Sequence, residues 1–417
     1  MTYNKTRLFW TSSLALCMAG IANALRANAA AELQRVYLDP IDKLHSAEMI
    51  GTVLGVPFLA FAITIAVSSP LLDIIGMGLL LPLAAVLVPA GMLLMGFAGE
   101  LASSGDGVYH LLWAGAAIAG VGWGLVETVM NPLIASLYPD DKTAKLNSAH
   151  AWWPGGLVIG GLLGVAMSNM QLSFQMKLGI VLLPAIAVFV LAIGVKYPPT
   201  ERAASGASTG SMFRELANPL FLVLFASMFA TAASELAPGQ WVDLALSRTV
   251  GMPGILLLVY VSGLMFLMRH FAGPLVHRLS PIGVLWFSCL GAALGLVALS
   301  YASSPMLGLL AATLWGTGVC YMWPTMLATA SERFPKGGAL LMGLMGTAGT
   351  LSIQFVLPAM GSIYDAKKIE LAGGEAAFNA LQGDALNSVL GGAAQAVGDG
   401  EAEAFFAREL HEDRVHA

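Results

Sequence analysis

Long apolar runs dominate this chain and limit what it can fold into. Stretches of roughly 18 or more apolar residues with little charge have the length that a helix needs to cross the hydrocarbon core of a membrane. Eleven such stretches occur, at 8–36, 47–72, 77–99, 108–138, 147–169, 177–196, 218–246, 252–272, 281–302, 305–331 and 338–362. Only 11% of the 417 residues are charged, against about 25% in soluble domains. The sequence therefore predicts an all-α membrane protein.

Polar segments divide these spans into groups. Residues 197–217 are rich in Gly, Ser and Pro, which is typical of an exposed linker, and they separate six spans from five. The sequence predicts an N-terminal six-helix bundle at 1–196, a linker at 197–217, a C-terminal bundle at 218–365 and a polar tail at 366–417. The tail contains no run long enough to span, so a twelfth helix is not found.

The charge pattern indicates an orientation and excludes other classes of protein. Most Lys and Arg residues of the short loops fall on the side of the N-terminus, which places that side in the cytoplasm of a cell membrane. The net charge of −5 and the lack of a basic stripe give no sign of nucleic-acid binding. No catalytic, phosphate-binding or metal-ligand motif occurs, so we expect neither an enzyme nor a cofactor or metal.

The chain carries a weak internal repeat. Pro70-Leu71 and Pro274-Leu275 follow the second and eighth spans at an offset of 204, and Glu127 and Trp323 each stand twelve residues before a Pro that ends a span. These matches predict two homologous halves related by an axis along the membrane normal, which is a transporter arrangement.

The segments "ETVMNP" (127–132) and "KLNSAHAWWPGG" (145–156), with Asp73 and Gly76 in the turn after the second span, resemble known transporters. Two six-helix halves with a middle linker resemble the major facilitator superfamily. Within it, the two segments are similar to the fucose/glucose/galactose–proton symporter group. The resemblance implies a proton-coupled sugar carrier, although no acid stands near Ala24, where the group has one, and His150 and Trp153 replace its Gln and Asn.

Glu127 is the first candidate for chemistry. A charge at the centre of a membrane helix costs about 2.5–3.5 kcal/mol on insertion scales, and a bound proton removes that charge. Trp123, Glu127 and Asn131 share one helix face, and Pro132 loosens the hydrogen bonding beneath them. We expect Glu127 to be the proton-coupling group; the alternative is a structural acid bonded to a neighbouring helix.

Arg26 is the second anomaly, and it shares a helix face with Asn23. At 1.5 Å per residue, Arg26 lies about 27 Å, Glu235 about 25 Å and Glu127 about 16 Å from the cytoplasmic ends of their helices. Arg26 therefore matches Glu235 better than Glu127 in depth within the membrane, which favours an Arg26–Glu235 gate. An anionic substrate, or a position near the outer interface, is an alternative role for Arg26.

Other polar and aromatic residues complete the candidate binding site. A break at Pro238-Gly239 would expose backbone groups to a ligand, and aromatic faces can stack on sugar rings. His150 could equally lie in a cytoplasmic loop. The predicted substrate-binding residues are Asn23, Arg26, Asn131, His150, Trp153, Gln240, Trp241 and Trp323.

These features predict a monomeric secondary transporter that moves a small polar solute by alternating access, and we expect a sugar with protons as the coupling ion. One alternative is a carrier of an anionic or amphipathic substrate centred on Arg26. The other is a membrane sensor that keeps the fold without transport.

Overall fold

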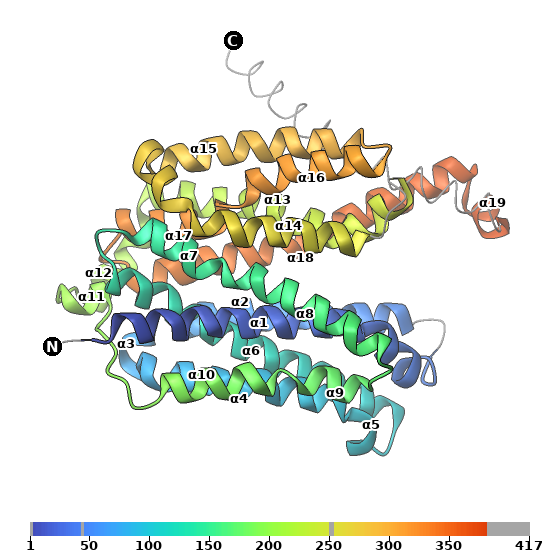
Figure 1. Cartoon of the computed structure of the whole chain (residues 1–417), viewed down its shortest axis with the longest axis horizontal. Coiled ribbons are helices and arrows are strands. Elements are labelled where there is room, and N and C mark those ends of the chain that lie inside the picture. Colours follow the sequence, from blue (N-terminus) through green and yellow to red (C-terminus); the bar gives the residue numbers. More distant parts are fainter. Residues whose placement is uncertain (1–2, 43–45, 250–253, 382–417) are drawn as a thin grey trace, which may run out of the picture. The chain divides into compact units, whose positions relative to one another are not determined.

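The computed structural model describes residues 3–42, 46–249 and 254–381, and these residues form helices and connecting turns without a strand (Figure 1). The longer helices are α1 (Lys5–Leu33), α2 (Ser46–Ser68), α4 (Met77–Gly96), α6 (Gly105–Leu137), α8 (Trp152–Asn169), α10 (Leu182–Ala192), α13 (Pro219–Thr249), α14 (Gly254–His270), α15 (Ala272–Ser300), α16 (Pro305–Val319), α17 (Met322–Arg333) and α18 (Gly338–Ala372). The short helices are η1 (Gln34–Leu38), α3 (Leu72–Ile75), α5 (Ala98–Leu101), α7 (Lys142–His150), α9 (Phe174–Gly179), α11 (Glu201–Ala204), α12 (Thr209–Arg214), η2 (Glu215–Ala217) and α19 (Glu375–Ala380).

The described residues include ten helical segments that are long and apolar enough to cross a membrane. The remaining expected span, 252–272, corresponds to α14, of which 17 residues are described. Large apolar side chains such as Ile63, Leu183 and Phe287 are exposed on these helices, which suits a chain whose solvent is lipid. The prediction of an all-α membrane protein is confirmed.

The chain forms two compact units. Unit 1 consists of Met1–Phe229, Phe266–Ile282 and Pro324–Leu351, and unit 2 consists of Ala230–Met265, Gly283–Trp323 and Ser352–Ala417. The expected linker, 197–217, contains α11, α12 and η2. The predicted domain limits at 196, 217 and 365 stay predictions.

Close helix packing in unit 1 depends on glycine. A Cβ atom on Gly156 of α8 would lie 2.3 Å from the carbonyl oxygen of Cys17 in α1, and one on Gly120 of α6 would lie 2.5 Å from the carbonyl oxygen of Pro57 in α2. Both distances are too short for any side chain. Membrane helices associate through such close backbone contact because no hydrophobic force draws them together in lipid.

The two turns of the internal repeat share one backbone feature. Gly76, between α3 and α4, has φ +90° and ψ 140°, and Ser280, inside α15, has φ +62° and ψ 163°. The two residues are 204 positions apart, as Pro70 and Pro274 are. The same bend at matched positions supports the predicted repeat.

Helix α13 corrects one prediction. It continues through Pro238, where the sequence suggested a break. A proline inside a helix leaves the carbonyl four residues earlier without its usual donor, and here that carbonyl belongs to Ser234. The indole Nε1 of Trp315 donates a hydrogen bond to the Ser234 oxygen at 3.0 Å. The freed carbonyl is therefore satisfied, and the helix has no need to open.

The tenth span is broken instead. α16 ends at Val319 and α17 begins at Met322, with Cys320 and Tyr321 in a turn between them. The ring of Pro324 would clash with the carbonyl of the residue four positions earlier in a continuous helix, and that residue is Cys320. Trp323 therefore stands at the start of a half-helix. α18 also runs on to Ala372, past the expected end of the last span at 362.

The bend at Gly76 can be tested by substitution. We expect Gly76→Ala to lower the melting temperature in detergent, because a Cβ in this conformation costs about 1–2 kcal/mol although no atom lies within 4 Å of it. Gly51→Ala is the matched control, since Gly51 lies in α2 and its Cβ would also meet nothing within 4 Å. Equal melting temperatures of the two variants would show that the bend is not strained.

Candidate functional site

Helix α6 places the intramembrane acid at the middle of unit 1. The helix begins after Ser104, whose side chain accepts a hydrogen bond from the backbone N–H of Gly107 at 3.2 Å. Glu127 and Asn131, one turn apart on this helix, are 5% and 4% exposed. The predicted acid is thus enclosed by protein, and its partners come from the chain itself.

Three of the predicted residues meet here. The side-chain nitrogen of Asn131 donates to the carboxylate Oε2 of Glu127 at 2.7 Å and to the Glu127 carbonyl at 3.0 Å. Because this nitrogen is the donor, the Asn131 oxygen accepts, and the Nε2 of His150 donates to it at 2.8 Å. The same Nε2 lies 3.8 Å from Glu127 Oε2. We call Glu127, Asn131 and His150 the Glu127 cluster.

His150 is not a loop residue. It is the last residue of α7, it is 2% exposed, and the chain turns at Ala151 before α8. The turn aims the imidazole at α6. The alternative of a loop at the membrane surface is therefore wrong.

Sequence reasoning missed a fourth member of this neighbourhood. Arg269, in the last turn of α14, is fully buried, and its Nη1 donates to the His150 carbonyl at 3.1 Å. Arg269 was overlooked because it was assigned to a cytoplasmic loop, among the Lys and Arg residues that indicate the orientation of the chain in the membrane. The signal for it is the apolar run of α14, which continues to Met268 with no polar spacer before the arginine.

Aromatic rings lie next to the acid along α6. Trp123, one turn before Glu127, stacks on Trp153 with ring centroids 4.6 Å apart and an interplanar angle of 10°. Phe61 packs against Trp123 at 4.1 Å. Trp153 is half-buried, and the buried Nε1 of Trp123 has no hydrogen-bond partner among the described residues. Trp153 therefore lies against Trp123, one helical turn from Glu127, and its role in substrate binding stays a prediction.

Asn23 and Arg26 form a second polar position on α1. The Nη2 of Arg26 donates to the Asn23 oxygen at 2.7 Å, and Arg26 is 5% exposed. Its buried Nε has no hydrogen-bond partner among the described residues. The two residues share a helix face as predicted, and the cation is held by a neutral amide.

The predicted residues of the C-terminal half lie in unit 2. Glu235 is buried on α13, and Trp323 is half-buried at the start of α17. The side chains of Gln240 and Trp241 fall outside the described part of the structure. Because Arg26 and Glu235 belong to different units, the gate that they would form stays a prediction.

A layer of polar contacts closes the end of unit 1 that holds α7. Lys142 pairs with Glu201 of α11 at 2.6 Å, and Glu201 also accepts a hydrogen bond from Ser331 of α17 at 3.0 Å. Thr143 donates to Glu332 of α17 at 2.6 Å. These bonds hold the first turn of α7, the helix that ends at His150.

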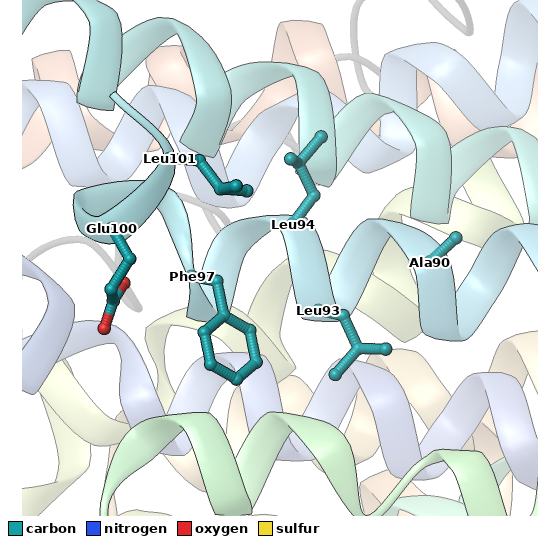
Figure 2. Close-up of a pocket in the computed structure, with 6 residues that line it drawn as sticks. All are labelled: Ala90, Leu93, Leu94, Phe97, Glu100 and Leu101. Atoms are coloured by element: carbon teal, nitrogen blue, oxygen red, sulfur yellow. The ribbon is translucent and has the colours of Figure 1, made fainter. Parts of the chain in front are cut away.

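The pocket in Figure 2 is a separate feature. It is an open, mainly apolar groove on α4 and α5 lined by Ala90, Leu93, Leu94, Phe97, Glu100 and Leu101. None of the predicted site residues lines it, and lipid chains would suit its apolar side chains. In the described part of the chain, no group of three or more His, Cys, Asp or Glu side chains could hold a metal ion.

Comparison with known proteins decides the family. The sequence model of the Major Facilitator Superfamily matches residues 9–356. The chain belongs to this superfamily. It is therefore a multi-pass membrane transporter and not an enzyme, and the resemblance seen in the sequence is confirmed. No curated protein matches the chain in sequence.

Solved structures share the fold. The fucose:proton symporter FucP of E. coli, in its outward conformation, is 17% identical with a TM-score of 0.69, over 95% of this chain and 97% of that one. The proton:xylose symporter XylE of E. coli, bound to 6-bromo-6-deoxy-D-glucose, is 15% identical with a TM-score of 0.70, over 94% of each chain. The human organic anion transporter MFSD10 is 14% identical with a TM-score of 0.67, over 95% and 98%. At these identities the likeness concerns the fold alone.

The Glu127 cluster can be tested through stability. We expect Asn131→Leu to lower the melting temperature in detergent strongly, because it leaves the Glu127 carboxylate and the His150 Nε2 without a partner, at about 1–3 kcal/mol for each buried group. Asn28→Leu is the control, since the hydrogen bond that Asn28 accepts among the described residues, from Ser168 at 3.3 Å, is exposed. If both variants melt alike, Asn131 does not hold the cluster together.

Proposed function

We propose that this chain is a proton-coupled symporter of a sugar, acting as a monomer in the cell membrane with its N-terminus in the cytoplasm. Membership of the major facilitator superfamily supports transport by alternating access. Two of the transporters that share its fold are named as sugar:proton symporters. What we propose beyond the family is the proton as coupling ion, a sugar as substrate and a cytoplasmic N-terminus.

The Glu127 cluster is the observation that carries the proposal. A buried carboxylate at membrane depth is expensive when charged, and taking up a proton removes the charge. Asn131 binds Oε2 through a neutral amide, which leaves the other carboxylate oxygen, Oε1, as the atom to accept the proton. Glu127 can therefore alternate between two charge states without loss of its position.

The surroundings of the cluster suit a sugar. The half-buried Trp153, stacked on Trp123, supplies an aromatic face for the apolar face of a pyranose ring. The unpartnered Nε1 of Trp123 offers a hydrogen-bond donor to a hydroxyl group. A neutral polyol needs such donors, acceptors and aromatic faces rather than a strong counter-charge.

Replacing Glu127 by Gln tests the coupling. Gln is nearly the same size and mimics the protonated state, so we expect Glu127→Gln in proteoliposomes to exchange labelled sugar across the membrane but to lose accumulation driven by a pH gradient. Radiolabelled L-fucose, D-xylose and D-glucose are the probes, with and without a protonophore. Exchange reports binding and the conformational step, and accumulation reports the proton.

Three outcomes of this experiment matter. Accumulation by Glu127→Gln equal to that of the parent would show that Glu127 does not couple protons. Parent uptake that ignores the protonophore would contradict symport. A parent that carries none of the three sugars would contradict the proposed substrate.

Arg26 supports a second candidate function, the transport of an organic anion. Its buried guanidinium is bonded to a neutral amide, and its Nε has no partner among the described residues. A buried cation with no counter-ion is costly, and a substrate carboxylate would supply one. MFSD10, which shares the fold, is named as an organic anion transporter.

A charged sugar and charge-reversal variants can distinguish the two roles of Arg26, anion binding and a gate with Glu235. If Arg26 binds an anion, D-galacturonate should inhibit sugar uptake more strongly than D-galactose does, and Arg26→Gln should remove that difference. If Arg26 and Glu235 form a gate, the double variant Arg26→Glu/Glu235→Arg should recover part of the uptake that each single variant loses. A double variant no better than the worse single variant would exclude the gate.

A further inference from the structure

We propose that the groove on α4 and α5 binds one phospholipid with a primary ammonium headgroup, such as phosphatidylethanolamine. An acyl chain of the lipid lies in the groove, and the ammonium group meets the Glu100 carboxylate. This site is additional to the function proposed above and does not depend on it. All the residues that form it belong to unit 1.

The groove lies within one half of the bilayer. α4 has 20 residues, which is about 30 Å at 1.5 Å per residue, the thickness of the hydrocarbon core. Ala90, Leu93, Leu94 and Phe97 follow one another at helical spacing over the end of α4. The groove that they line holds about 400 Å³, within the range of about 300–1,000 Å³ of small-molecule sites. It therefore has the depth and the apolar lining for an acyl chain of a single leaflet.

Glu100 stands where the headgroups of the lipids begin. It follows the end of α4 at Gly96 by four residues, and it lies at the opposite end of the groove from Ala90 (Figure 2). Phe97 and Leu101 beside it are 42% and 62% exposed. An apolar groove that ends in a charge at the membrane surface matches the two parts of a phospholipid.

Neutral donors hold the Glu100 carboxylate. The Tyr37 hydroxyl donates to Oε2 at 3.2 Å, and the Nε2 of Gln175 donates to Oε1 at 3.2 Å. Among the described residues no cation pairs with Glu100, and Lys177, two residues after Gln175, pairs with Glu32 at 3.0 Å. The carbonyl groups at the C-terminus of α4 add partial negative charge. The end of the groove is therefore negative and complementary to a cation.

The same contacts fix the position of the carboxylate. A Cβ on Gly99 would collide with the ring of Tyr37, so α5 packs on this ring with no room for a side chain. Tyr37 in turn packs edge-on against Phe174 of α9, with ring centroids 5.3 Å apart, and Gln175 is the next residue of α9. The acid is thus held in place before a ligand arrives, which lowers the entropic cost of binding.

The chemistry of the headgroup decides which lipid fits. A primary ammonium group has three N–H donors, and its hydrogen bonds to a carboxylate are charge-assisted. A choline headgroup carries the same charge but no N–H donor. A glycerol headgroup leaves the negative charge of the phosphate uncompensated, and Glu100 repels it. The expected order of binding is therefore phosphatidylethanolamine, then phosphatidylcholine, then phosphatidylglycerol.

The measurement is native mass spectrometry of the full-length protein, purified in detergent and equilibrated with an equimolar mixture of these three lipids with identical acyl chains. We expect the lipid that is retained to be phosphatidylethanolamine over phosphatidylcholine by about two- to fivefold, the preference that an exposed ion pair supports. Phosphatidylglycerol should be retained least. The mono- and dimethylated forms of phosphatidylethanolamine should fall between the first two lipids, because each methyl group removes an N–H donor and keeps the charge.

Two variants separate the headgroup from the groove. Glu100→Gln should bind phosphatidylethanolamine and phosphatidylcholine equally and should retain more phosphatidylglycerol than the parent. Ala90→Trp, which fills the groove, should lose one bound lipid whatever its headgroup. Asp106→Asn removes an exposed charge shortly after α5, and Ile63→Trp adds an indole on the exposed face of α2. Both are controls and should match the parent.

Several outcomes would overturn the proposal. One is a parent that does not prefer phosphatidylethanolamine to phosphatidylcholine, and another is a preference that persists in Glu100→Gln. A third is an Ala90→Trp variant that melts as the parent does and keeps every lipid. If Ala90→Trp does not fold, the methylated lipids and Glu100→Gln decide. A dimer that Ala90→Trp converts to a monomer, with no lipid preference in the parent, would assign the groove to a second copy of the chain.

These outcomes are independent of the sugar assay. A protein that carries none of the three sugars and still selects phosphatidylethanolamine through Glu100 would contradict the proposed substrate and keep the lipid site. Sugar uptake coupled to protons, in a protein whose bound lipids ignore Glu100, would keep the proposed function and reject the lipid site.

Discussion

Lipid offers no hydrogen bonds, and the rest of this structure depends on that constraint. Each polar group at membrane depth has to find its partner in the chain. The carbonyl of Ser234, freed by Pro238, is bonded by Trp315, and α13 stays continuous. The Glu127 carboxylate and the His150 imidazole meet on the single amide of Asn131. Helix shape and candidate site therefore follow from the same requirement.

The constraint also separates two kinds of charge in unit 1. At its end, contacts join α7 to α11 and α17: Lys142 pairs with Glu201, and Thr143 donates to Glu332. Deeper in, Glu127 and Arg269 are buried. A change of one proton matters little in the first group and much in the second, because the interaction of charges grows as water is excluded.

Local patterns in the sequence predicted what depends on local chemistry. The apolar runs gave the spans, and the spacing of Glu127 and Asn131 placed them on one face of α6. The offset of Pro70 and Pro274 anticipated the shared bend at Gly76 and Ser280. What escaped prediction depends on partners distant in sequence. Nothing near Pro238 announces that Trp315 will satisfy its freed carbonyl, and nothing near Arg269 announces the carbonyl of His150.

The two repeats differ in chemistry at equivalent positions. Glu127 and Trp323 are equivalent positions, yet one carries a titratable acid in a continuous helix and the other an indole at the start of a half-helix. Only the first can change charge, so in the proposed symport the proton binds in the N-terminal half of the chain. Alternating access requires the other half to respond. The helix α14 contributes residues to both units, because its last turn belongs to unit 1 while the rest of the helix continues into unit 2.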